Sequence, residues 1–135
     1  MSFDRGVLAF LGAFVLLAGL ACLAAPASFA QQAGWSATPA GLTEIRAFYG
    51  GLQVGLGCFL IWCSRHLALI LPGLFVEGFV VGGIGIARSL GMIVDRAPST
   101  FHLTNLAVEG VTVALVVVAI SKRRAVQPDW SVVPK

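Results

Sequence analysis

Charged side chains are scarce in this chain. Its 135 residues include 9 Lys or Arg and 6 Asp or Glu, so 11% are charged and 58% are apolar, and the mean hydropathy is +0.92. An ordinary soluble domain is about a quarter charged, and a chain this short cannot bury so much apolar surface in one core. The composition therefore excludes an ordinary soluble domain and predicts a membrane protein.

The sequence also lacks the patterns that carry most recognisable chemistry. Its three cysteines, Cys22, Cys58 and Cys63, lie inside apolar runs without a CxxC or a zinc-ligand spacing, so we expect apolar packing and no metal site. No serine lies in a nucleophile–base pattern, and no cofactor is expected. The basic residues form no extended face with interleaved aromatics, which argues against nucleic-acid binding.

Long apolar runs are the dominant feature of what remains. They predict helices over about residues 6–25, 39–63, 67–94 and 103–121. Each run reaches the roughly 20 residues that cross about 30 Å of hydrocarbon, and apolar segments in lipid must be helical to satisfy their backbones. The predicted fold is an all-α integral membrane four-helix bundle over residues 1–124, followed by a short cytoplasmic tail at 125–135.

The first run has an alternative interpretation. Arg5, the apolar stretch and Ala27-Ser28-Phe29-Ala30 also fit a secretory signal peptide with its cleavage site. Asp4 weakens the positively charged start that such a peptide needs. We therefore favour an uncleaved anchor helix.

The boundaries of the other runs have local signals. Thr38-Pro39 is typical of a helix start, and Ser99 or Thr100 can cap the last helix. Pro72 predicts either a kink or the effective start of the third helix. The short polar turn at residues 64–66 makes the second and third helices antiparallel neighbours.

The basic residues predict an orientation. With both termini in the cytoplasm, the inner segments hold six Lys or Arg, and the outer loops hold only Arg96; the six are Arg5, Arg65, Lys122, Arg123, Arg124 and Lys135. This bias follows the positive-inside rule. We expect a multi-pass protein of the bacterial inner membrane, with Trp35 near the outer face and Trp62 near the inner face.

Charges inside the predicted spans are the strongest functional signal, because each is costly unless it is paired or hydrated. The orientation places most of these side chains in the outer half of the membrane. Helical spacing aligns them into one polar stripe on each of three helices. The sequence therefore predicts a polar pocket between the second, third and fourth helices, in which Arg46 and Arg88 face Glu109. The candidate residues are Glu44, Arg46, Tyr49, Gln53, Arg88, Asp95, His102, Asn105 and Glu109.

Three roles remain open for this set of residues. The charges can form a structural ion-pair network, bind a ligand, or support catalysis or proton coupling. Glu77 lies close to the predicted midplane, far from the other charges on its helix, and is a candidate protonatable group. His102 is expected to be a polar residue at a loop end rather than a metal ligand.

Glycines mark the second and third predicted helices. Gly51-x3-Gly55 and Gly78-x3-Gly82 have the small-residue spacing that lets membrane helices approach closely. We therefore expect close helix packing there.

The stretch Glu44-Ile45-Arg46-Ala47-Phe48-Tyr49-Gly50-Gly51 resembles a bacterial four-helix membrane family of unknown function. The resemblance covers residues 6–120 and continues through Arg88, Gly91, Asp95 and Glu109. The group is broadly similar to DoxX-like proteins, some of which associate with oxidoreductases or quinone chemistry. The resemblance implies the fold and the candidate residues but no established activity, and Glu77 lies outside its motif.

Two classes of function follow from these features. The first is a binding or accessory protein that holds a membrane lipid or small amphiphile, or that acts as a subunit of a larger membrane complex or a homo-oligomer. The second is a membrane enzyme or proton-coupled carrier that uses Glu109 with Arg46 and Arg88. We favour the first, and we lean against an enzyme.

Overall fold

The computed structural model describes the backbone of residues 2–126 and the side chains of residues 2–123. The elements are α1 (Phe3–Ala24), α2 (Pro26–Ala33), α3 (Pro39–Glu44), the π-helix η1 (Ile45–Gly51), α4 (Leu52–Ser64), the 3-10 turn η2 (Leu67–Leu69), α5 (Ile70–Val94) and α6 (Thr100–Val126). Four helical segments are long and apolar enough to cross a membrane, namely Phe3–Ala24, Pro39–Ser64, Leu67–Val94 and Thr100–Arg123. The predicted all-α fold with four membrane-length helices is confirmed.

Capping side chains and prolines set the helix boundaries. Thr38 Oγ1 accepts a hydrogen bond from the backbone N–H of Gly41 at 3.1 Å. Ser99 Oγ accepts one from the backbone N–H of His102 at 3.2 Å, so both predicted caps are present. Pro72 lies in the first turn of α5, directly after η2, and marks the start of the helix.

The last helix is longer at both ends than its apolar run suggests. It begins at Thr100, ahead of the predicted Leu103, and continues to Val126, past the predicted end at Ser121. Polar residues extend it because a helix that has left the lipid needs no apolar side chains. Of the predicted tail, residues 127–135 lie outside the described part of the chain.

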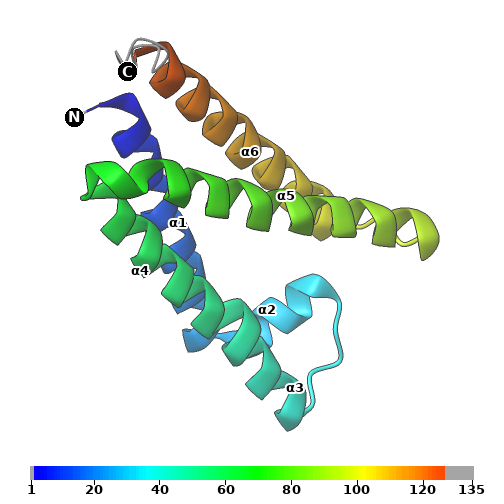
Figure 1. The fold of residues 1–135 in the computed structure, drawn as a ribbon. Coiled ribbons are helices and arrows are strands. Elements are labelled where there is room, and N and C mark those ends of the chain that lie inside the picture. The colour runs from blue at the N-terminus through cyan, green and yellow to red at the C-terminus, as the bar shows by residue number, and fades with distance from the viewer. Residues whose placement is uncertain (1, 127–135) are drawn as a thin grey trace, which may run out of the picture.

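The four spans associate as two pairs. The α1 helix packs along α4 and η1, and α5 packs along α6, while α1 also contacts α5 and α6. Figure 1 shows the two pairs diverging from the turn between α4 and α5, with α2 and α3 at the far end of the first pair. We call the end with the α4–α5 turn, the start of α1 and the end of α6 the terminal end, and the end with α2, α3 and residues 95–99 the loop end.

Glycines bring α1 and α4 into backbone contact. A Cβ atom at Gly57 would lie 2.5 Å from the backbone nitrogen of Leu16, and one at Gly12 would lie 2.9 Å from that of Ile61. A Cβ atom at Gly19 would lie 2.7 Å from the backbone nitrogen of Val54, and one at Gly50 would lie 2.6 Å from the side chain of Leu23. The predicted glycine pairs are used less. Among the described residues, no atom of another segment lies within 4 Å of a Cβ built at Gly55, whereas one built at Gly78 would be 3.1 Å from Val116 on α6.

The apolar core lies towards the terminal end, where all four spans meet. Its buried residues come from both ends of the chain and from the central turn: Val7, Leu8, Leu11, Leu60, Cys63, Ile70, Leu74, Val116 and Ala119. Van der Waals packing rather than a hydrophobic driving force holds helices together in lipid. This cluster therefore positions the two pairs relative to each other.

Charged side chains link the helices at the terminal end. Arg123 of α6 forms an ion pair with Asp4 of α1, and its Nη2 donates a hydrogen bond to the carbonyl of Leu67 at 3.0 Å. Arg5 Nε donates to the carbonyl of Ser64 at 3.0 Å. Two of these bonds satisfy carbonyls at the turn between α4 and α5, so the four spans are linked by polar contacts as well as by packing.

Candidate functional site

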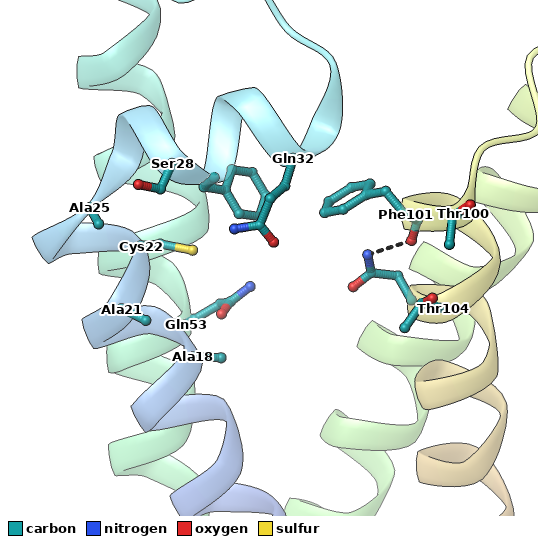
Figure 2. A pocket seen from close by; sticks show the side chains of 12 residues that line it. Ala18, Ala21, Cys22, Ala25, Ser28, Gln32, Gln53, Thr100, Phe101 and Thr104 are labelled. Carbon is teal, nitrogen blue, oxygen red and sulfur yellow. Dashed lines mark hydrogen bonds between the residues drawn. The ribbon is translucent and has the colours of Figure 1, made fainter.

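The loop end contains a cavity of about 650 Å³ between the two helix pairs. One wall comes from α1, α2 and α4 and the other from α6, and Figure 2 shows the open space between them. None of the lining residues is charged; they are Ala18, Ala21, Cys22, Ala25, Ser28, Phe29, Gln32, Gln53, Thr100, Phe101, Thr104 and Asn105. The cavity therefore combines apolar surface with neutral hydrogen-bonding groups, which is the usual composition of a small-molecule site.

The amides in this cavity differ in their hydrogen bonding. Asn105 Nδ2 donates to the carbonyl of Phe101 on its own helix at 2.8 Å, as Figure 2 shows. The side chains of Gln32 and Gln53 extend into the space from the opposite wall (Figure 2). Gln53 Oε1 is buried and has no hydrogen-bond partner in the described part of the chain. A buried acceptor without a donor costs about 1–3 kcal/mol, and this oxygen lies in the wall of the cavity while the amide nitrogen of Gln53 points into the space (Figure 2).

An aromatic cluster borders the cavity at the loop end. The ring of Phe29 on α2 lies 4.8 Å from that of Tyr49, 5.8 Å from that of Trp35 and 5.8 Å from that of Phe101, measured between ring centroids. Phe101 belongs to α6 and Tyr49 to η1. Phe29 therefore connects the two helix pairs across one side of the cavity.

Arg88 and Glu109 form the predicted ion pair between α5 and α6. Arg88 Nη2 donates to Glu109 Oε1 at 2.8 Å, and Arg88 Nε donates to the two carboxylate oxygens at 3.0 and 3.2 Å. Their side chains are only 20% and 12% exposed. Both carboxylate oxygens accept hydrogen bonds from Arg88. The result is an electrically neutral ion pair that links α5 to α6.

Arg46 does not join this pair. It is exposed, and it makes no hydrogen bond or ion pair with other side chains among residues 2–123. The span that carries it contacts α1, and η1 makes no contact with α5 or α6. The expected convergence of Arg46 and Arg88 on Glu109 is thus absent, because α1 is the packing partner of the second span at that level.

The remaining candidate residues divide among three cavities. Gln53 and Asn105 line the large one. Arg88, Asp95 and His102 line a cavity of about 340 Å³ beside the loop at 95–99, where His102 Nδ1 lies 3.3 Å from the carbonyl oxygen of Ala97. Glu44 and Tyr49 line a third cavity of about 450 Å³ beside η1. These candidate residues therefore do not share one pocket.

Glu77 is fully buried in α5. Neither of its carboxylate oxygens has a hydrogen-bond partner in the part of the chain that the structure describes. Gly73, one turn earlier on the same face, lies against Leu8 and Cys63, since a Cβ built there would be 3.0 Å from each of them. Glu77 is therefore directed towards α1 and α4, next to the apolar core.

The sequence matches the family described as a domain of unknown function, DUF4345, over residues 3–120. The chain belongs to the DUF4345 family. No curated protein and no solved structure gives a match, so the similarity to DoxX-like proteins stays a prediction. The DUF4345 match covers all four spans except the final residues of α6, and it includes every candidate residue.

Two features of this DUF4345 bundle have only faint signals in the sequence. The α2 helix starts with Pro26 and ends at Gly34, which has a φ of 74°, so the usual proline and glycine punctuation was present between the first two apolar runs. The Asp4–Arg123 ion pair was also foreseeable. An even number of antiparallel spans places the first and last helix ends on the same side, where an acidic and a basic residue can meet.

Proposed function

We propose that this protein binds a neutral amphiphile, a lipid or a small molecule with an apolar body, in the cavity at the loop end. The observation that supports this most directly is a cavity of about 650 Å³ whose lining is uncharged and into which the amide side chains of Gln32 and Gln53 extend (Figure 2). A ligand with a hydroxyl or carbonyl oxygen can accept hydrogen bonds from these amides. Its apolar part would contact the alanines of α1 and the rings of Phe29 and Phe101.

The charge distribution favours a neutral ligand over an anionic one. Arg46 and Arg88 do not line this cavity, and Arg88 is already paired with Glu109. A buried anion without a cation would be strongly destabilised. The same pair weighs against a proton-coupled carrier based on Glu109, because both oxygens of that carboxylate accept hydrogen bonds from Arg88.

The proposal includes an orientation. Arg5, Arg65, Lys122 and Arg123 lie at the terminal end and Arg96 lies at the loop end. The positive-inside rule then puts the terminal end in the cytoplasm and the cavity in the outer half of a bacterial inner membrane. An amphiphile would enter from the outer leaflet. A role as an accessory subunit of a larger membrane complex is the alternative.

Native mass spectrometry of protein purified in a mild detergent, combined with solvent extraction of the same sample, tests the proposal. We expect a stoichiometric neutral amphiphile on the wild type and on Gln31→Leu, and none on Gln53→Leu. Gln31 is a matched control because it is an exposed glutamine of α2 outside the cavity lining.

Three outcomes would contradict the proposal. They are a folded wild-type protein without ligand, a ligand that Gln53→Leu retains, and an anionic ligand that is lost on Arg46→Gln. A protein that purifies only with a larger partner would support the accessory-subunit alternative instead.

A further inference from the structure

A second cavity at the loop end has a different chemistry. It has a volume of about 450 Å³ and is lined by three aromatic rings and one carboxylate, those of Trp35, Phe48, Tyr49 and Glu44. No Lys or Arg is among its lining residues. Phe29 contacts both Trp35 and Tyr49 and lines the larger cavity, so the aromatic cluster separates the two spaces.

The π-helix brings three of these residues together. In η1 (Ile45–Gly51) the backbone follows the wider turn in which residues five apart are hydrogen-bonded. Glu44 lies directly before η1, and Phe48 and Tyr49 lie within η1, four and five residues after Glu44. Both aromatic residues therefore lie on the same side of the helix as the carboxylate. The same residues belong to the Glu44–Gly51 stretch, whose charges and rings take no part in the larger cavity.

The rings of Trp35 and Tyr49 meet edge to face rather than in a parallel stack. The centroids of Trp35 and Tyr49 are 5.5 Å apart, and their planes meet at 62°. Aromatic faces attract cations through their quadrupoles, and cages of several rings are the usual site for quaternary ammonium groups. A nearby carboxylate adds direct attraction. An anion would meet repulsion from Glu44, and a neutral group without a hydrogen-bond donor would gain nothing from it.

We infer that this cavity binds a quaternary ammonium group, carried either by a lipid headgroup or by a small water-soluble molecule. The bulky methylated cation suits a site lined by three aromatic residues and one carboxylate. Within the described residues the only charged group lining this site is the Glu44 carboxylate. The site is separate from the one proposed for the neutral amphiphile and does not depend on it.

Choline and its carbon isostere 3,3-dimethyl-1-butanol test the inference, because they differ in charge but hardly in shape. The measurement is saturation-transfer NMR with protein in a maltoside detergent, which carries no ammonium group. We expect choline to bind at least about fivefold more tightly than the isostere. The inference is wrong if choline and the isostere bind equally well both in this detergent and in the nanodiscs described below. It is also wrong if choline binds in neither.

Two pairs of variants locate the site. Glu44→Gln and Trp35→Leu should each weaken choline binding at least about fivefold. Asp95→Asn and Trp62→Leu are the matched controls and should bind as the wild type does, since neither residue lines this cavity. Gln53→Leu should also bind choline normally, which separates this inference from the proposed amphiphile site. Equal losses in Glu44→Gln and Asp95→Asn would show a general charge effect and would overturn the inference.

Bilayers of defined composition distinguish the two sources of the group. Protein from phosphatidylcholine nanodiscs should retain phosphatidylcholine in native mass spectra if the ligand is a headgroup, and Glu44→Gln should lose it. If the ligand is water-soluble, choline should bind equally well in phosphatidylglycerol and phosphatidylcholine nanodiscs. Failure of both, with correctly folded protein, would overturn the inference.

Discussion

The two ends of the bundle are built from the same four spans in opposite ways. At the terminal end the apolar residues of all spans form one closed core, and Arg5 and Arg123 satisfy carbonyls at the α4–α5 turn. At the loop end the helix pairs separate around a cavity of about 650 Å³. There an amide oxygen of Gln53 has no hydrogen-bond partner among the described residues. Phe29 and Phe101 make an aromatic contact between the two helix pairs.

This difference teaches that stability and binding are located in different parts of a very small protein. Packing and ion pairs fix the terminal half, so the loop half can leave polar groups unsatisfied without unfolding. Substitutions should therefore divide into those that change the free energy of unfolding and those that change only ligand retention. The Arg88–Glu109 pair links α5 to α6. Substitutions there test whether this pair contributes to the free energy of unfolding or only to ligand retention.

The largest effect is expected from Arg88→Gln. It leaves the Glu109 carboxylate without a counter-charge between two membrane-spanning helices and should lower the free energy of unfolding by about 3 kcal/mol. Thermal unfolding in detergent at a fixed scan rate measures this. The double variant with Glu109→Gln should recover part of the loss. Arg46→Gln is the control and should change stability by less than about 0.5 kcal/mol; similar losses in Arg46→Gln and Arg88→Gln would contradict the structural assignment.

A somewhat smaller loss is expected from Gly57→Ala. The added methyl group would lie 2.5 Å from the backbone nitrogen of Leu16, and backbone atoms cannot move aside cheaply, so we expect a cost of about 2 kcal/mol. Gly55→Ala, half a turn away, meets no atom within 4 Å and should be neutral or stabilising by up to about 1 kcal/mol. The difference between the two unfolding temperatures is the readout. Equal effects would mean that α1 and α4 do not touch through this face.

Glu77→Leu should have the opposite sign. Replacing a fully buried carboxyl that has no partner among the described residues by an apolar side chain removes a desolvation cost of about 1–2 kcal/mol. The unfolding temperature should therefore rise, whereas Glu77→Gln, which keeps a polar group, should not gain as much. A clear loss of stability in Glu77→Leu would show that a ligand or a water network occupies this position in the membrane.

The smallest effect is expected at the terminal end. Asp4→Asn removes the charge that pairs with Arg123 but keeps an oxygen that can accept a hydrogen bond from it, so it should cost about 1 kcal/mol. Salt should reduce this cost, because Asp4 and Arg123 lie at the ends of their spans, where ions in the water can screen the pair. The cost of Arg88→Gln should hardly depend on salt, because Arg88 and Glu109 lie further inside their spans. Unfolding temperatures of both variants at low and high ionic strength provide the comparison. Equal salt dependence would mean that the two pairs have the same environment.

Local signals predicted much of the architecture. Run lengths gave the four spans, Thr38 and Ser99 gave two helix starts, and helical spacing placed Arg88 and Glu109 where they could pair. Each of these depends on one segment or on two segments joined by a short loop. This is why a single sequence was sufficient for them.

The choice of neighbours could not be predicted in the same way. A polar stripe indicates that a helix face turns inward, but it does not say which helix it will face. That choice follows from glycines on two separate segments, Gly12 and Gly19 on α1 and Gly50 and Gly57 on the second span, which fit only when the helices are paired. Arg46 was therefore expected opposite Glu109, although α1 is the partner of its helix at that level.

The π-helix at Ile45–Gly51 also sets the phase of the second span. One additional residue in a helical turn rotates everything before it by about 100° relative to everything after it. The segment thus lets Gly50 and Gly57 face α1 while Glu44 lines a cavity on another side. Deleting a single residue here would restore an unbroken α-helix with its glycine contacts intact, and it would turn the aromatic and acidic wall away from its present position.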